Sequence, residues 1–301
     1  MYDICCIGHI TLDKVVTPEA AIFMAGGTSF YFSHAIRNMN VKYGLVTSLA
    51  ASEIHFAEEM RSAGIEINVK PSAHTVYFEN IYSHNRDHRT QRVLQTADPF
   101  TAAQLDGINA SIFHLGPLLA DDIPLDLIKM LAQRSAVSLD VQGYLRKVEN
   151  NNVVAIDWKD KREALPYISI LKANEAEAEV LTGCKDVQKA AKLLSDWGVK
   201  EVVITLGSMG SLIYTDEIFY TIPAYIPDAV TDATGCGDTY MAGYLYQRNK
   251  NATPQQAGAF AAAIASIKIA ASGPFTGTEA AVVNMLIKAK KKIVFSCWPL
   301  L

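Results

Sequence analysis

The heptapeptide Asp-Ala-Thr-Gly-Cys-Gly-Asp, residues 232–238, joins a segment rich in turn formers to a segment with helical periodicity. Apolar residues then recur at i, i+3 and i+4 in Met241, Tyr244 and Leu245, which predicts a helix. A helix start leaves backbone N–H groups without intrahelical partners, and the helix dipole adds positive potential there. Because small residues let an anion approach the backbone, we expect an anion hole formed by the N–H groups of Thr234, Gly235, Cys236 and Gly237.

Asp238 closes this heptapeptide and places a carboxylate beside the predicted anion hole. A carboxylate there repels the anion that the N–H groups attract. A reaction removes the conflict if Asp238 takes a proton from a hydroxyl while the N–H groups stabilise charge on a transferred phosphoryl group. The alternative is an ordinary aspartate in the first turn of a helix, where the dipole favours it.

The heptapeptide resembles the D-(T/S)-x-G-A-G-D motif of the ribokinase/PfkB family of sugar and nucleoside kinases. Ala233 and Cys236 depart from that motif, but both are small and leave the backbone accessible. Further family motifs follow one another in the expected order over nearly the whole chain. The resemblance implies a three-layer α/β/α ribokinase-like fold with a mainly parallel central sheet and a small β lid.

The composition of the 301 residues, 50% hydrophobic and 19% charged, is that of a globular protein with a substantial core. A net charge of −4 gives no electrostatic reason to expect nucleic acid or an anionic membrane as a partner. Apolar runs fall short of the ~18 residues of a membrane span, and the first is too short for a signal peptide. The five cysteines show no metal-ligand spacing and suit a reducing compartment, so we expect a cytoplasmic protein.

The first apolar run, Ile4 to Ile7, predicts a buried strand, and polar residues and glycines follow it. Asp13 lies in the segment after it, where open α/β sheets bind ligands, and is either a ligand for substrate hydroxyls or a turn former. The pair Gly26 and Gly27 makes either a tight turn or a close approach to a ligand, and Thr28 or Ser29 could cap the next helix. The resemblance implies that Asp13, Gly26, Gly27 and Thr28 bind the substrate.

Strand-like runs dominate residues 65–96, unlike the alternating strands and helices on either side. We expect residues 14–23 and 65–96 to form the β lid of a single domain covering 1–301, over the site or against a partner subunit. The family often uses such a lid to form dimers, which implies a homodimer. His84 and His88 have metal-like spacing only in a helix, and a hairpin turn is expected there instead.

Two clusters follow predicted strands in the middle of the chain. Asp140, Gln142 and Arg146 could orient a polyol, a phosphate or one another, and similar runs in the family imply substrate binding by Gln142 and Arg146. Asn174 and Glu177 have capping-box spacing. They also match the family's N-x-x-E motif, which implies that Asn174 lies near the nucleotide phosphates and that Glu177 helps to hold Mg²⁺.

Thr205, Gly207 and Gly210 match the family's T-x-G-x-x-G stretch, which implies nucleotide binding, although two glycines in a hairpin turn are the simpler interpretation. Neither a Walker A sequence nor a dinucleotide-binding G-x-G-x-x-G follows a strand. The resemblance therefore implies an ATP-dependent carbohydrate kinase with Mg²⁺ that acts on a small sugar or polyol. In some relatives a monovalent cation lies near Asp232.

The acceptor is open at this stage. Asp140, Gln142 and Arg146 together with the Gly-Gly-Thr-Ser-Phe stretch resemble the inositol-kinase branch of the family, which implies an inositol, or cyclitol, as an alternative acceptor. Aromatic stacking by Phe30 or Tyr31 would suit a nucleoside. A third hypothesis, from another class, is a non-catalytic regulator that binds a polyol or a nucleotide.

Overall fold

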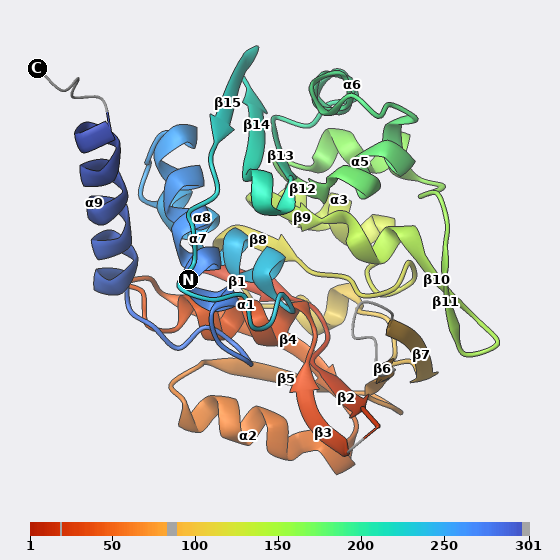
Figure 1. Cartoon of the computed structure of the whole chain (residues 1–301). Coiled ribbons are helices and arrows are strands. Elements are labelled where there is room, and N and C mark those ends of the chain that lie inside the picture. Colours follow the sequence, from red (N-terminus) through yellow and green to blue (C-terminus); the bar gives the residue numbers. More distant parts are fainter. Residues whose placement is uncertain (19, 83–88, 297–301) are drawn as a thin grey trace, which may run out of the picture.

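The structure is a computed structural model that describes residues 1–18, 20–82 and 89–296 (Figure 1). The turn expected around His84 and His88 lies outside the described residues. Strands and helices alternate along most of the chain, and they build one large and one small sheet. No helix in the described ranges has both the length and the apolar character that crossing a membrane requires.

The large sheet has nine strands, and its seven consecutive strands from β13 to β5 run parallel. Two antiparallel strands, β14 and β15, extend one edge. Apolar residues dominate the central strands because helices cover both faces of a parallel sheet. In spatial order the strands are β15 (Ile218–Ile222), β14 (Ser211–Thr215), β13 (Glu201–Thr205), β12 (Ile170–Asn174), β9 (Ala136–Asp140), β8 (Ala110–Leu115), β1 (Tyr2–Ile7), β4 (Tyr43–Leu49) and β5 (Ile67–Pro71).

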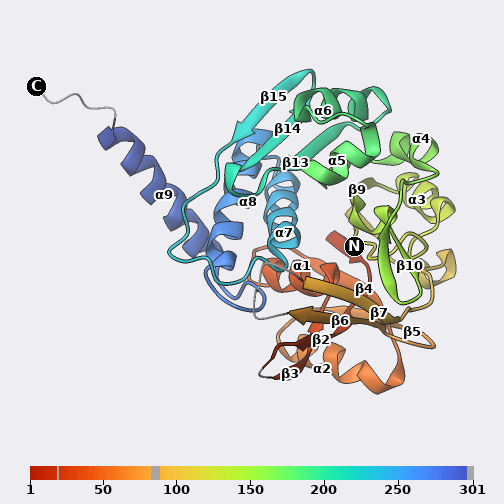
Figure 2. The same ribbon diagram turned by 45° about the vertical axis from the view of Figure 1, so that its right-hand side comes forward.

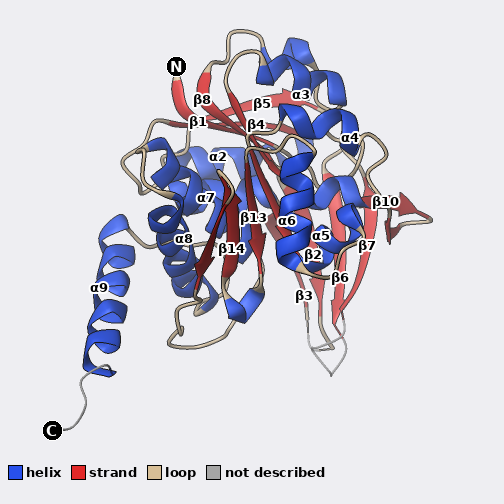
Figure 3. Ribbon diagram, turned by 90° about the horizontal axis from the view of Figure 1, so that it is seen from above, coloured by secondary structure: helices blue, strands red, loops and turns tan. Residues whose placement is uncertain are grey.

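Helices form a layer on each face of the large sheet, which confirms the predicted three-layer α/β/α arrangement (Figure 3). One layer contains α1 (Thr28–Ile36), α2 (Ile54–Ser62), α7 (Cys236–Asn249) and α8 (Pro254–Ile269), with α9 (Glu279–Ser296) packed on α8. The other contains α3 (Leu125–Ala132), α4 (Lys161–Ala164), α5 (Glu175–Thr182) and α6 (Val187–Asp196). Short 3₁₀ helices are η1 (Ala51–Glu53), η2 (Ala102–Leu105), η3 (Val141–Leu145), η4 (Leu165–Tyr167) and η5 (Gly207–Met209).

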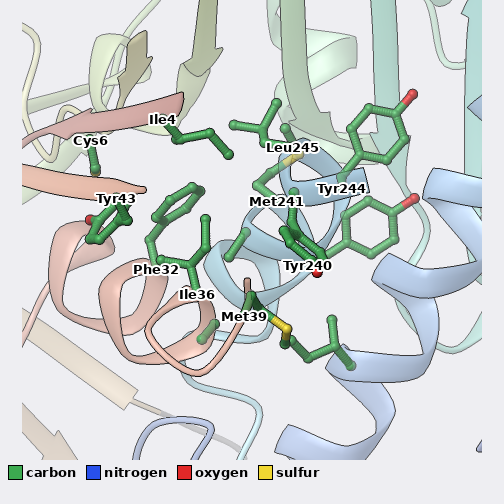
Figure 4. Close-up of a cluster of buried hydrophobic side chains, with 14 of the residues drawn as sticks. Ile4, Cys6, Phe32, Ile36, Met39, Tyr43, Tyr240, Met241, Tyr244 and Leu245 are labelled. Carbon is green, nitrogen blue, oxygen red and sulfur yellow. The ribbon is translucent and has the colours of Figure 1, made fainter. Parts of the chain in front are cut away.

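The core between α1, α7 and the sheet holds the first turns of α7 in place. Phe32 and Ile36 of α1 meet Met241 and Leu245 of α7 in this cluster (Figure 4), and all four side chains are fully buried. Burying such side chains contributes about 1.5–3 kcal/mol each. The heptapeptide thus supplies the first residues of a helix that the core fixes firmly.

The small sheet is the lid, and its strands lie beside the large sheet (Figure 2). Its pairs are antiparallel except for the parallel pair of β2 and β6. In spatial order the strands are β10 (Arg146–Glu149), β11 (Asn152–Ala155), β7 (Arg89–Gln95), β6 (Val76–Tyr82), β2 (Thr11–Val16) and β3 (Ala21–Gly26).

The structure corrects the predicted boundaries of the lid. Residues 67–71, expected in the lid, form β5 and pair in parallel with β4 of the large sheet. The reason is that β4, α2 and β5 form a β-α-β unit, in which α2 returns the chain to the same sheet. The hairpin β10–β11 joins the lid instead and pairs with β7. The two strands of this hairpin have four residues each and contain both polar and apolar residues, so the sequence shows no clear strand periodicity there.

Candidate active site

A cleft of about 1350 Å³ lies between the lid and the carboxyl ends of the large sheet's parallel strands. Most of the residues predicted from the sequence line it, namely Asp13, Gly27, Thr28, Gln142, Arg146, Asn174, Thr205, Gly207, Thr234, Gly235, Gly237 and Asp238. Four others do not: Gly26, Glu177, Gly210 and Cys236. A hollow of about 230 Å³ beside Arg37, Tyr43 and Glu66 contains none of the predicted site residues.

Asp238 lies in the first turn of α7 and opens onto the cleft. Burial raises the pKa of its carboxyl to about 6, and the negative charge of Asp140 adds to the rise. Lys172, the Thr28 hydroxyl and Arg146 act in the opposite direction. A carboxyl group with such a pKa can accept a proton near neutral pH.

The turn before Asp238 leaves fewer N–H groups free for an anion than the four that the sequence predicted. The N–H of Thr234 donates to Asp232 Oδ1 at 2.9 Å, and the N–H of Cys236 donates to the carbonyl of Ala233 at 3.2 Å. These two N–H groups close the turn and are already satisfied. Within the described ranges, the N–H groups of Gly235 and Gly237 make no hydrogen bond, so they are the donors left for an anion.

Gly235 has a positive φ of 74°, and a Cβ there would overlap the ring of Tyr31. Both observations require glycine at this position. The Cα of Gly235 packs on Tyr31 of α1, so the turn is held by the same helix that packs on α7. Thr28 also belongs to α1, but the residue at the N-cap is Gly27, not Thr28 or Ser29 as expected, and the Thr28 hydroxyl bonds to Asp238 instead.

Lys172 is a residue of the site that the sequence reasoning missed. Its Nζ lies 2.9 Å from Asp140 Oδ2 and 3.9 Å from Glu177 Oε2, and a Cβ on Gly237 would be 3.3 Å from it. Burial alone lowers the pKa of this ammonium, but Asp140 and Glu177 outweigh burial and raise it, so Lys172 is charged beside the anion hole. The available signal was a lysine inside an otherwise apolar strand.

The predicted capping box at the start of α5 is confirmed. Asn174 Oδ1 accepts from the N–H of Glu177 at 2.9 Å, and Glu177 Oε2 accepts from the N–H of Asn174 at 2.7 Å. Gln142 Nε2 donates to the other oxygen of Glu177 at 3.4 Å. No group of three or more histidine, cysteine, aspartate or glutamate residues in the described part of the chain is arranged to hold a metal ion by itself.

Asp13 lies on the lid strand β2 and faces the cleft, where Thr11 Oγ1 donates to its Oδ1 at 2.6 Å. A Cβ on Gly26 would overlap the Asp13 carboxylate, so Gly26 leaves space for Asp13 and does not line the cleft. Asn80 and Gln91 on neighbouring lid strands also line it, and Gln91 Nε2 donates to Asn80 Oδ1 at 3.0 Å. This pair was not predicted from the sequence. The available signal was the alternation of side chains along a strand, which places every second one on the cleft face.

Thr205 and Gly207 end β13 and begin η5, and both line the far end of the cleft. Gly210 has a φ of 99° and packs directly against the carbonyl of Ile222, so it shapes the turn between β13 and β14. Gly210 therefore acts as a glycine of the hairpin turn, as the simpler interpretation of the sequence expected. Its neighbours Thr205 and Gly207 belong to the cleft.

The three-layer fold, with its lid and a cleft at the carboxyl ends of the parallel strands, is the architecture of a ribokinase-like phosphotransferase. A family model described as pfkB family carbohydrate kinase matches residues 36–281, and the chain belongs to that family.

Known proteins resemble the chain over most of its length. A cytidine kinase of Thermococcus kodakarensis is 26% identical over 83% of this chain and 90% of its own. A pyrophosphate-dependent ribokinase-family kinase, solved with a pyrophosphate analogue and myo-inositol, is 28% identical with a TM-score of 0.82 over 90% of this chain and 97% of its own. A third protein is 26% identical, with a TM-score of 0.83 over 95% of this chain and 99% of its own. In that protein, two substitutions to leucine convert a pyrophosphate-dependent myo-inositol-1 kinase into a myo-inositol-3 kinase.

Proposed function

We propose that this kinase transfers a phosphoryl group from ATP to a hydroxyl of a small cyclic polyol, with Asp238 as the general base. The observation that carries the proposal is Asp238 itself: a carboxyl with a pKa raised to about 6, in the same turn as the free N–H groups of Gly235 and Gly237. Asp238 accepts the hydroxyl proton as the oxygen attacks the γ-phosphorus, and the bond from that phosphorus to the β–γ bridging oxygen breaks, so that ADP leaves. The two N–H groups and the Lys172 ammonium then stabilise the charge on the equatorial phosphoryl oxygens.

The acceptor end favours a compact molecule with several hydroxyls. Asp13, Asn80 and Gln91 on lid strands, Arg146 at the start of the lid strand β10 and Gln142 just before it all line the cleft, so it offers both hydrogen-bond donors and acceptors. The two leucine substitutions that change the product of the myo-inositol kinase described above stand eleven residues apart, the first replacing an asparagine. Asn80 and Gln91 have the same spacing here, which supports a cyclitol such as myo-inositol as the acceptor.

The donor end favours ATP because the cleft continues past the anion hole to Thr205 and Gly207. A volume of about 1350 Å³ exceeds the 300–1,000 Å³ typical of a site for one ligand and leaves room for a nucleotide beside the acceptor. Pyrophosphate is the second candidate. Lys172 supports it, because a buried ammonium beside Gly237 can bind a second phosphate without any nucleoside.

Mg²⁺ fits this site as a companion of the donor phosphates. Glu177 is 8% exposed and its carboxylate is held by Asn174 and Gln142, so Asn174 and Glu177 would reach the ion through water. When bound, the ion would neutralise phosphate charge.

The deciding experiment measures turnover of the purified chain with ATP or pyrophosphate against myo-inositol, ribose and cytidine, each with and without Mg²⁺. We expect turnover with ATP, Mg²⁺ and a cyclitol, and a loss of about 10²-fold or more in Asp238→Asn. Turnover with pyrophosphate but not with ATP would show that pyrophosphate is the donor. Binding of both ligands without turnover under any condition would contradict the proposal and favour the non-catalytic regulator.

We also propose that a second copy of the chain binds at the lid. Strand β3 is the edge of the lid sheet in the described ranges, and Phe23 on it is 59% exposed. An open edge with apolar side chains is a surface for pairing with another strand. Size-exclusion chromatography of wild type and Phe23→Asp tests this, because a dimer should become a monomer in the variant.

A further inference from the structure

Lys268 is a second buried lysine near the anion hole, and the phosphoryl-transfer mechanism above does not use it. It lies in the last turn of α8 and is 2% exposed. Its Nζ donates to the backbone carbonyl of Asp232 at 2.8 Å and lies 3.3 Å from Asp232 Oδ2. The ring of Tyr31 is 5.8 Å away, within reach of a cation–π interaction.

Asp232 connects this ammonium to the anion hole. Its Oδ1 accepts the N–H of Thr234, and its Oδ2 accepts the N–H of Gly273 in the loop after α8. Burial opposes the charge, but the hydrogen bonds from Thr234 and the charge of Lys268 hold the pKa of the Asp232 carboxyl below its ordinary range. The carboxylate therefore stays ionised and joins the end of α8 to the turn that precedes α7.

Tyr31 provides a second connection between Lys268 and the anion hole. Its ring lies against Gly235, whose N–H is one of the two free donors, and Lys268 lies over the same ring. The backbone of the turn is also docked on α8, because the N–H groups of Thr231 and Asp232 both donate to the carbonyl of Ile269. Lys268 thus contacts both the turn itself and the ring that packs against Gly235.

A monovalent cation, which some family members hold near Asp232, does not fit this arrangement. Such an ion needs backbone and carboxylate oxygens, and the oxygens of Asp232 that face α8 are already occupied by the Lys268 ammonium. A second cation there would face a buried like charge, which is strongly unfavourable.

We propose that the Lys268 ammonium is a built-in replacement for that monovalent cation. It supplies one fixed positive charge that orders the turn at 232–235 and strengthens the anion hole, so phosphate binding does not depend on added potassium or sodium. A fixed ammonium needs no reorganisation when charge develops on the phosphoryl group. Lys268 is thus a positioning residue that acts through Asp232 and Tyr31.

The test uses the full chain and inorganic pyrophosphate as the probe, and it needs no acceptor. Its affinity and the thermal midpoint are measured in choline, sodium or potassium chloride at equal ionic strength. For wild type we expect no difference between the salts. Lys268→Met should bind pyrophosphate about tenfold more weakly in choline chloride, the loss expected for one charged interaction. Potassium or ammonium should restore binding, while Lys268→Arg should need neither.

Two results would overturn the inference. One is a wild type whose affinity or thermal midpoint rises in potassium but not in choline chloride. The other is a folded Lys268→Met whose lost affinity no monovalent cation restores, because Lys268 would then only anchor the end of α8. If Lys268→Met does not fold, the wild-type comparison still decides. A wild type that binds no phosphate compound contradicts the proposed function, while the thermal midpoints still test this inference.

Discussion

The two ends of the cleft are built in different ways. The anion-hole end stands on α7, whose first turns are packed between α1 and α8, and two buried lysines fix its charge. The other end, where we propose that the acceptor binds, is one face of the lid, where Asn80 and Gln91 project from lid strands and bond to each other. Changes at the first end disturb both chemistry and core, whereas changes at the second can alter the acceptor alone.

Asp238→Asn should have the largest effect, because it removes the base and leaves the shape of the site intact. We expect turnover to fall by about 10²-fold or more. The thermal midpoint should rise, since burial disfavours the ionised carboxyl in the folded protein. Stopped or coupled assays and a thermal melt measure the two effects. Near-normal turnover would remove Asp238 from the mechanism.

Lys172→Met should lower the free energy of unfolding by about 3–5 kcal/mol, because it leaves Asp140 and Glu177 buried without their cation. Urea unfolding measures this loss. The matched control is Lys129→Met, which breaks the exposed pair with Glu163 and should change stability by less than about 1 kcal/mol. Equal effects of the two substitutions would show that Lys172 is not a buried part of the site.

Asn80→Leu with Gln91→Leu should act on the acceptor and leave the fold unchanged. The loss of two polar groups that face the cleft should lower kcat/KM for a cyclitol by about tenfold and change which hydroxyl is phosphorylated. Arg92→Leu is the control, because its side chain points to the opposite face of β7. Nuclear magnetic resonance of the product identifies the phosphorylated hydroxyl. An unchanged product and rate would place the acceptor elsewhere.

The pH profile should show the smallest and most specific effect. The base must be ionised, so kcat/KM should fall on the acid side of about pH 6, by tenfold for each further unit. Asp140→Asn removes a like charge from the surroundings of Asp238 and should move this limb to lower pH. Asp157→Asn, a surface change, should leave it in place. A limb that Asp140→Asn does not move would show that another group titrates.

Much of the fold and the chemical centre could be predicted from the sequence because their signals are local. The alternation of strand-like and helical segments predicted a mainly parallel sheet between two helix layers, and the first predicted strand, Ile4 to Ile7, lies within β1. The spacing of Asn174 and Glu177 predicted a capping box, which depends only on neighbours along the chain. The glycines of the heptapeptide and Asp238 fall within one turn, so their relation is also visible without a structure.

Tertiary structure decided what depends on distant segments. The lid gained β10 and β11, and β5 went to the large sheet, because strand pairing is set by packing partners and not by the strand's own residues. Lys172 and Lys268 looked like isolated lysines in apolar segments until the fold placed Asp140 and Asp232 beside them. The sequence by itself thus pointed to the groups that we propose carry the reaction. Only the tertiary structure decided which buried charges surround them, because Coulomb interactions depend on distance in space.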